Sequence, residues 1–173
     1  MSHQTYDRAT LATDVVAFFD PASFALLLAF LVGGAVLAGR TRAGIVVGAA
    51  VLGAEITAQV LKQVLAVQRP FPADHYLPPA SWPSGHTTAA VSLLLGLLIV
   101  LPPRLRPPVA LLGGAFAAAT LGSLVLLGSH YPSDVLGGIL VSVAWCAAAF
   151  AVSGTARAPR AAQDRRRLRR ATG

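Results

Sequence analysis

The chain has 173 residues, of which 55% are apolar and only 12% are charged, and its mean hydropathy is +0.65. A soluble domain usually carries about a quarter charged residues, so this composition excludes an ordinary water-soluble globule. The net charge of +7 does not indicate nucleic-acid binding, because seven of the 14 basic residues fall within the last 17 positions. We therefore expect a membrane protein that has an Arg-rich tail over 156–173 and no nucleic-acid partner.

The first predicted element is a short interfacial helix over 13–19, at the membrane surface. Five apolar stretches follow it, and each is close to the ~20 residues that cross the hydrocarbon core. They run over 22–39, 43–66, 86–102, 108–127 and 135–153. No sheet-like alternation competes with this pattern. The predicted fold class is therefore all-α, an integral membrane bundle of about five transmembrane helices that occupies residues 1–155.

The basic residues predict the orientation of the bundle. If all five stretches span, one side holds 11 of the 14 basic residues, including the tail and the loop arginines Arg40, Arg42, Arg104 and Arg106. Positive charge accumulates on the cytoplasmic side, so we expect the tail there in a multi-pass protein of the cell membrane. The loop 68–85 and the segment 128–134 then share the extracytoplasmic face.

The second stretch carries polar residues that need explaining, since charge is rare in lipid. Glu55, Lys62 and Arg69 are seven residues apart, so they fall near one helical stripe with Gln59, which we expect to face the bundle interior. Lys62 and Arg69 are either snorkelling anchors or anion-binding cations. Glu55 pairs with Lys62, is protonated, or lines a polar cavity, and the sequence leaves these alternatives open.

Pro83-Ser84-Gly85-His86 leads directly into the third stretch. Ser84 or Thr87 can cap the helix, and a helix N-terminus favours an anion through its N–H groups and dipole. Gly85 allows that anion to approach the backbone closely, and His86 is then placed there with a proton to give. A capped helix start with an incidental histidine is the alternative interpretation.

His130 and Asp134 lie four residues apart at the outer junction of the fourth and fifth stretches. Asp134 can accept a hydrogen bond from one imidazole nitrogen and leave the other as a nucleophile or base, as in a catalytic triad. Two solvated loop residues are the alternative. The topology places all three polar segments on one membrane face, where two cations, a helix N-terminus and two histidines describe an oxyanion site.

At these residues the sequence resembles the type 2 phosphatidic acid phosphatase family of membrane lipid phosphatases. That family shows Lys-x6-Arg-Pro, Pro-Ser-Gly-His and Ser-Arg-x5-His-x3-Asp. Residues 62–70 match the first motif fully, 83–86 match the second fully, and Ser123, His130 and Asp134 match the third. The chain departs from the family in two ways: the third-motif arginine falls on Leu124, and we count five spans where the family commonly has six.

The resemblance implies hydrolysis of a phosphomonoester or diphosphate without a metal or cofactor. It implies that His130 is the nucleophile that forms a phosphohistidine, that Asp134 orients it, and that His86 is the general acid. The implied phosphate-binding groups are Lys62, Arg69, Ser84 and the N–H of Gly85. The implied substrate is a lipid phosphate among membrane lipids, with its tail between helices: an isoprenoid phosphate or diphosphate, phosphatidic acid or phosphatidylglycerol phosphate.

Further residues of the outer loops are candidate substrate contacts, namely Asp74, His75, Tyr76 and Ser129. One alternative is a metal site built from His75, His86, His130 and Asp134, although no known metal-ligand spacing occurs. Another, motivated by Leu124, is a catalytically weakened lipid-phosphate-binding or transport accessory protein. Glycine pairs such as Gly44 and Gly48 are expected to allow close packing of helices within one bundle. A homodimer contact is the alternative interpretation.

Overall fold

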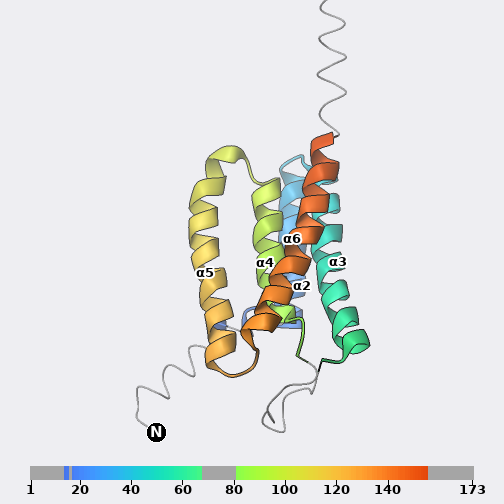
Figure 1. Ribbon diagram of the computed structural model, residues 1–173. Coiled ribbons are helices and arrows are strands. Elements are labelled where there is room, and N and C mark those ends of the chain that lie inside the picture. The colour runs from blue at the N-terminus through green and yellow to red at the C-terminus, as the bar shows by residue number, and fades with distance from the viewer. Residues whose placement is uncertain (1–13, 16, 68–80, 156–173) are drawn as a thin grey trace, which may run out of the picture.

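The computed structural model describes residues 14–15, 17–67 and 81–155, and Figure 1 shows their arrangement. They form five long helices and one 3-10 turn: α2 (Pro21–Leu37), α3 (Thr41–Leu65), α4 (Gly85–Val100), η1 (Pro103–Leu105), α5 (Arg106–Leu126) and α6 (Pro132–Thr155). No strand occurs in these described ranges. Each predicted apolar stretch is therefore confirmed as a helix. The tail and Arg69, Asp74, His75 and Tyr76 lie outside the described residues.

The bundle has the inside-out polarity of a membrane protein. Segments 41–65, 103–126 and 132–153 are long and apolar enough to cross a bilayer, while α2 and α4 are apolar but shorter. Large apolar side chains point outward, with Leu37 90% and Leu126 85% exposed. Small hydroxyl residues are instead fully enclosed, namely Ser84, Thr87, Thr88, Ser92, Thr120 and Ser142. Since lipid provides no hydrophobic drive between helices, small polar residues are the expected packing material.

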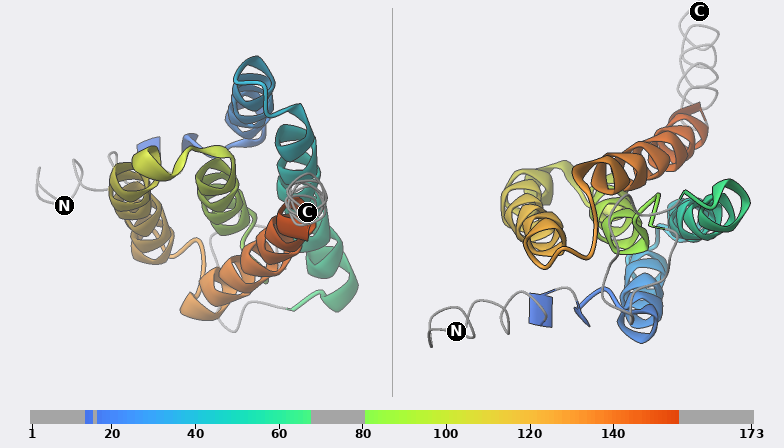
Figure 2. Two further views of the ribbon diagram at one scale, coloured as in Figure 1. Left: turned by 90° about the horizontal axis from the view of Figure 1, so that it is seen from above. Right: turned by 60° about the horizontal axis from the view of Figure 1, so that its bottom comes forward.

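Helix α4 is the centre of the bundle, and Figure 2 shows the other helices arranged around it. It packs against each of α2, α3, α5 and α6. A Cβ added to Gly96 would lie only 2.8 Å from Val47 of α3, so the absent side chain allows this close contact. On its other side the hydroxyl of Ser142 in α6 donates to the Thr88 carbonyl at 3.1 Å.

The Gly-xxx-Gly pair of α3 packs within the chain, as predicted. A Cβ on Gly44 would lie 2.9 Å from that of Ala35, and one on Gly48 would lie 2.6 Å from the Val32 side chain. Both partners belong to α2. These glycines therefore serve the approach of α2 to α3, whereas a Cβ on Gly33 would meet nothing within 4 Å.

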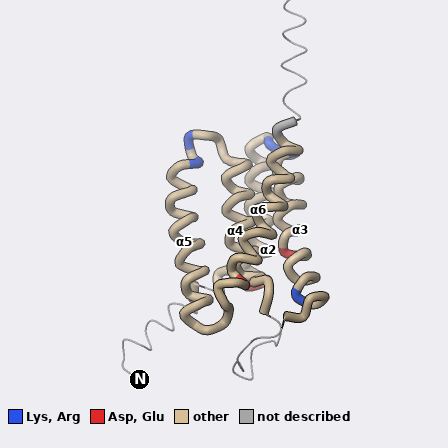
Figure 3. Tube along the Cα trace, viewed as in Figure 1, with Lys and Arg blue, Asp and Glu red and all other residues tan. Residues whose placement is uncertain are grey.

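The loop arginines gather at the C-terminal end of α4. Arg40 donates to the Val100 carbonyl, and Arg106 donates to the carbonyls of Leu101 at 3.1 Å and Ile99 at 3.4 Å. Cations stabilise a helix C-terminus because they neutralise its orphan carbonyls and the negative end of its dipole. Figure 3 shows these basic positions at the end of the bundle opposite the start of α4.

The segment before α2 differs from the expected surface helix. Asp14, Val15 and Ala17 have helical backbone, but Phe19 is only 8% exposed and joins the hydrophobic core. Phe18 packs edge-on against Phe116 of α5, with ring centroids 5.1 Å apart. The end of this segment is therefore part of the bundle, because its aromatic rings pack against α5 and the core.

Candidate functional site

Ser84 caps the start of α4. Its hydroxyl accepts from the N–H of Thr87 at 3.3 Å, so Ser84 rather than Thr87 is the N-cap. The first N–H groups of the helix, those of Gly85 and His86, have no acceptor within it and lie at the positive end of its dipole. Ser84 itself is fully buried, so the structure uses its side chain to fix this helix start.

The predicted pairing of His130 with Asp134 is confirmed. Nδ1 of His130 lies 3.2 Å from Oδ2 of Asp134, and the N–H of Tyr131 donates to the same oxygen at 3.0 Å. The pair is enclosed, with side chains 9% and 3% exposed. Asp134 lies in the first turn of α6, where the positive end of the helix dipole favours a carboxylate. The arrangement leaves Nε2 of His130 as the nitrogen that Asp134 does not hold.

Close packing of α6 on the turn before α4 brings these two segments together. The N–H of Ser84 donates to the Asp134 carbonyl at 3.0 Å. A Cβ on Gly138 would lie 2.8 Å from the Ser84 carbonyl oxygen, and one on Gly137 would lie 2.6 Å from Nε1 of Trp82. Only glycines fit at this distance, so the glycine pair of α6 positions the His130–Asp134 pair beside the start of α4.

A cavity of about 180 Å³ opens at the same end of the bundle. Glu55, Gln59 and Lys62 of α3 line it, opposite Gly85 and His86 of α4. Three members of the polar stripe of α3 therefore face this cavity, although Gln59 is exposed and Arg69 lies outside the described residues. Among the alternatives for Glu55, the structure places it on a polar cavity, where its carboxylate accepts from Gln59 at 2.6 Å. The cavity places a lysine, a histidine and a helix start around one space.

Gly85 has a packing role that the sequence did not indicate. A Cβ at this position would lie 2.8 Å from Nε2 of Gln59 and 3.1 Å from Oε1 of Glu55. The glycine therefore lets the polar stripe of α3 approach the N-terminus of α4. The anion approach predicted for Gly85 is untested by this contact, which concerns the side of the residue that faces α3.

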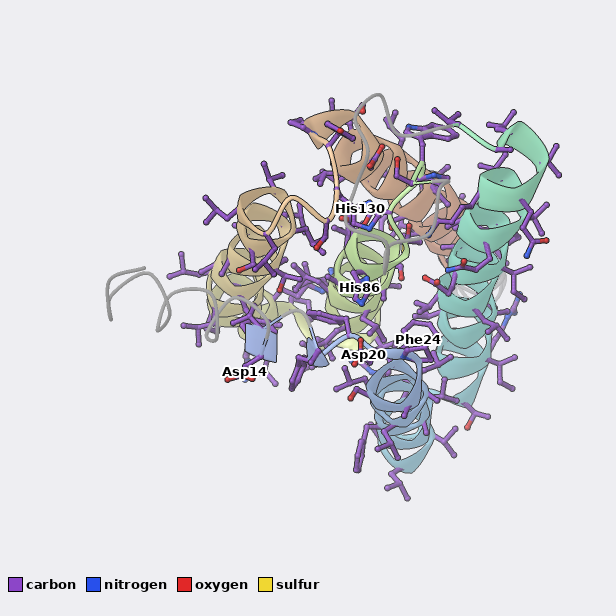
Figure 4. The ribbon with its side chains drawn as sticks, turned by 90° about the horizontal axis from the view of Figure 1, so that it is seen from below. Asp14, Asp20, Phe24, His86 and His130 are labelled. Atoms are coloured by element: carbon purple, nitrogen blue, oxygen red, sulfur yellow. The ribbon has the colours of Figure 1, made fainter. Side chains whose placement is uncertain are left out.

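The structure adds a residue that the sequence analysis missed. Oδ1 of Asp20 lies 3.2 Å from Nε2 of His86, and Figure 4 shows the two side chains directed toward each other. The neighbours Phe19 and Pro21 line the same cavity as His86. The available signal was an acidic residue at the start of the first apolar stretch, on the membrane face already predicted for the three motifs.

Leu124 lies in the protein interior, only 1% exposed, in the last turn of α5. Its carbonyl accepts from the N–H groups of Ser129 at 3.0 Å and His130 at 3.2 Å. Gly128 permits this reversal, because its φ of +65° lies in the left-handed region that glycine adopts freely. The position of the third-motif arginine is thus directly linked to the turn that carries His130.

The remaining predicted residues are placed only in part. Ser129 lies in the turn before His130, while Arg69, Asp74, His75 and Tyr76 stay predictions because they lie outside the described residues. Within the described ranges, no three His, Cys, Asp or Glu side chains form a group able to hold a metal ion. The alternative metal site also included His75, on which the structure has no bearing.

The fold and this geometry define a class: a helical membrane bundle with an enclosed histidine–carboxylate pair beside a capped helix start. The profile of the PAP2 superfamily matches residues 43–158, more than half of the chain, and the chain belongs to this superfamily. A comparison with curated proteins found no match.

Among solved structures, the chain is similar to the crystal structure of the first transmembrane PAP2 type phosphatidylglycerolphosphate phosphatase from Bacillus subtilis. The TM-score is 0.74 and the identity 20%, over 85% of this chain and 77% of that chain. At this identity the similarity shows the fold. The predicted all-α membrane bundle is therefore confirmed.

Proposed function

We propose that this protein is a membrane-bound, metal-independent lipid phosphate phosphatase that works through a phosphohistidine. The observation that carries the proposal is the enclosed His130–Asp134 pair, joined to the start of α4 by the 3.0 Å hydrogen bond from Ser84 to the Asp134 carbonyl. In this proposal the imidazole held by Asp134 acts together with the backbone N–H groups at the start of α4, which favour an anion. Membership of the PAP2 superfamily supports phosphatase chemistry.

In the proposed reaction, Nε2 of His130 attacks phosphorus while Asp134 holds Nδ1. The P–N bond forms as the P–O bond to the lipid alcohol breaks, and His86 gives its proton to the leaving oxygen. A water then attacks the phosphohistidine and loses its proton to His86, which restores both histidines and releases phosphate. The non-bridging oxygens are held by Lys62, Arg69, Ser84 and the Gly85 N–H. Preorganised donors of this kind supply much of the rate in acyl and phosphoryl transfer.

A second cavity supports a lipid as the substrate. It has a volume of about 320 Å³ and an entirely apolar lining from the segment before α2 and from α2, α4 and α5. We call this second cavity the apolar groove. Phe19 lines both the apolar groove and the polar cavity that His86 lines. A phosphate in the polar cavity thus has an apolar space beside it for an acyl or isoprenoid chain. The candidates remain an isoprenoid phosphate or diphosphate, phosphatidic acid and phosphatidylglycerol phosphate.

The proposal includes the topology. The site end of the bundle is extracytoplasmic in the cell membrane, and the end with Arg40 and Arg106 is cytoplasmic, together with the Arg-rich tail over 156–173. Arg40 and Arg106 lie at the opposite end of α4 from the cavity, which supports this orientation under the positive-inside rule. Residues 1–155 are the phosphatase domain in this proposal, and a homodimer is an additional arrangement.

The test is hydrolysis by the purified protein, in detergent and in liposomes, of a panel of lipid phosphates and diphosphates with EDTA present. We expect release of phosphate from at least one lipid, and a fall of roughly 10²-fold or more for His86→Ala on that lipid. Brief incubation with a 32P-labelled lipid should label the protein through an acid-labile bond. A parental rate in both His86→Ala and His130→Ala would contradict the assigned roles.

The apolar groove has its own test. Leu27 lines the groove, whereas its neighbour Leu26 is 62% exposed on the outer face of α2. We expect Leu27→Trp to raise KM for long-chain lipid phosphates and to leave short-chain, water-soluble phosphates unaffected, because the added ring fills the groove. Leu26→Trp is the matched control and should leave both substrates unchanged. An equal effect of Leu27→Trp on both substrate classes would exclude the groove as the chain site.

Leu124 favours a second candidate function, a lipid-phosphate-binding or transport accessory protein with weakened catalysis. A charge-assisted hydrogen bond contributes about 1.5–3 kcal/mol. Loss of such a bond from the third-motif arginine to the transition state therefore lowers the rate by roughly one to two decades. This candidate predicts lipid-phosphate binding without turnover and a gain of activity in Leu124→Arg. Val125→Arg is the matched control, because Val125 is 40% exposed on the neighbouring face. Turnover by the parent protein that Leu124→Arg does not raise would exclude the accessory function.

A further inference from the structure

Asp20 makes a contact that its position in the helix does not require. It is the N-cap residue of α2, where an Asp side chain usually accepts from an N–H of the first turn. No such cap bond forms here. The carboxylate instead reaches His86, 66 positions later in the chain, with Oδ1 3.2 Å from Nε2. The side chain of Asp20 thus makes a tertiary contact with a histidine of the candidate site in place of a cap hydrogen bond in its own helix.

The backbone around Asp20 holds the carboxylate in place. Its N–H donates to the Ala17 carbonyl at 3.1 Å, and its own carbonyl accepts from Phe24 at 2.8 Å. Phe19 before it is buried in the core, and Pro21 after it has a restricted backbone. Both neighbours line the polar cavity. An acid on an anchored turn, beside the cavity, is placed to orient a side chain of the site.

The two histidines of the site are held by opposite nitrogens. Asp134 contacts Nδ1 of His130, whereas Asp20 contacts Nε2 of His86. The other charged groups on the cavity with His86 are Glu55 and Lys62 of α3. Because a carboxylate accepts from a ring N–H, Nε2–H of His86 can donate to Asp20, and Nδ1 is then the nitrogen of a doubly protonated ring that can donate elsewhere.

We propose that Asp20 is a positioning residue for His86, which it orients so that Nδ1 delivers the proton to the leaving oxygen of the lipid alcohol. The inference rests on the proposed phosphatase function. As the P–O bond breaks, its electron pair goes to the leaving oxygen, which takes the Nδ1 proton, and the hydrogen bond from Nε2–H to Asp20 stays intact. A water proton returns to Nδ1 when the phosphohistidine is hydrolysed.

The experiment compares leaving groups, because proton delivery matters only for a poor one. Asp20→Asn, in the full-length protein, is assayed with an alkyl lipid phosphate and with 4-nitrophenyl phosphate. We expect kcat on the lipid to fall about 10- to 100-fold and kcat on the aryl ester to fall less than about threefold. Asp20→Glu should recover part of the lipid rate. Asp14→Asn is the matched control in the same segment, since Asp14 lies away from His86 in Figure 4 and is exposed.

The outcomes separate a failure of this inference from a failure of the proposed function. A parent that hydrolyses the lipid phosphate, together with an equally fast or faster Asp20→Asn, overturns the role of Asp20 and leaves the phosphatase intact. If Asp20→Asn lowers kcat by the same factor on the lipid phosphate and on 4-nitrophenyl phosphate, the role of Asp20 is also overturned, because a merely structural role would affect both substrates alike. A parent without any hydrolysis refutes the proposed function.

A second measurement needs no turnover. The 15N signals of His86 in the intact protein report which ring nitrogen carries the proton, and His86→Gln assigns them. We expect protonated Nε2 in the parent and a changed ring-nitrogen spectrum in Asp20→Asn, with the His130 signals unchanged. An Asp20→Asn spectrum identical to that of the parent overturns the inference even if the protein hydrolyses no lipid.

Discussion

The two histidine–carboxylate contacts share a separation of 3.2 Å but differ in their surroundings. His130 and Asp134 are 9% and 3% exposed, whereas His86 and Asp20 are 32% and 55% exposed. The first pair is local, four residues apart at the start of one helix. The second joins segments 66 residues apart. The difference in burial suits the two proposed roles, since a nucleophile requires a fixed direction and a proton donor requires exchange with water.

The largest effect should come from removing the enclosed imidazole. We expect His130→Ala to lower kcat on lipid phosphate by about 10⁴-fold or more, because no other group in the proposed mechanism can form the covalent intermediate. The same variant should lose the 32P label. Ser133→Ala is the matched control, since Ser133 is exposed in the same turn. A labelled His130→Ala protein would place the nucleophile elsewhere.

The next largest effect should come from the enclosed carboxylate. Asp134→Asn is expected to lower kcat by roughly 10²- to 10³-fold, because the amide no longer fixes the tautomer of His130. Because Asp134 also accepts a hydrogen bond from the N–H of Tyr131 inside the protein, we expect the free energy of unfolding to fall by about 1–3 kcal/mol. Parallel kinetic and thermal-denaturation measurements check both effects. A stability loss at an unchanged kcat would reduce Asp134 to a structural residue.

Ser84→Ala tests the connection between the enclosed pair and the start of α4. We expect a stability loss of about 1 kcal/mol, because the N-cap hydroxyl is removed. The backbone bond from residue 84 to Asp134 remains, and the hydroxyl is only one of the proposed phosphate-binding groups, so kcat/KM should fall by about tenfold or less, measured on the preferred lipid. Ser84→Thr keeps a cap oxygen and should recover most of the stability. A loss of kcat/KM comparable to that of Asp134→Asn would mean that the hydroxyl of Ser84 is an essential group of the site and more than a helix cap.

The smallest expected effect is the change in stability on removing the partly exposed contact between Asp20 and His86. Asp20→Asn should change the free energy of unfolding by at most about 1 kcal/mol, because an exposed ion pair is screened by solvent. Thermal denaturation of Asp20→Asn beside Asp134→Asn measures the contrast directly. Equal losses in the free energy of unfolding for the two variants would show that the difference in burial between the two pairs does not affect stability.

Local pattern determined much of what the sequence could predict. The five helices followed from runs of apolar residues, and the contact of His130 with Asp134 followed from their spacing at the start of a helix. The sequence also narrowed the cap to Ser84 or Thr87 and placed Lys62 on one stripe with Glu55, for the same reason. Each of these features depends on neighbours within two turns of one helix.

The features that escaped prediction depend on packing between distant segments. Asp20 looks like an ordinary helix cap until α2 is placed beside α4, and Phe19 looks like an interfacial aromatic until it is seen in the core. Gly85 was assigned to anion approach, but its contact with Gln59 depends on how closely α3 lies. One sequence carries no direct record of such distances.

The hydrogen bond between Ser84 and Asp134 has a consequence for biogenesis. The ribosome makes Ser84 about fifty residues before Asp134, so the segment that carries the proposed phosphate-binding groups is translated before its partner segment. We expect nascent chains that end before α6 to be inert, and separately expressed pieces cut between α5 and α6 to regain turnover only when they are reunited. Under the proposed mechanism, the active site is thus complete only after His130 and Asp134 have been translated and α6 has packed beside α4.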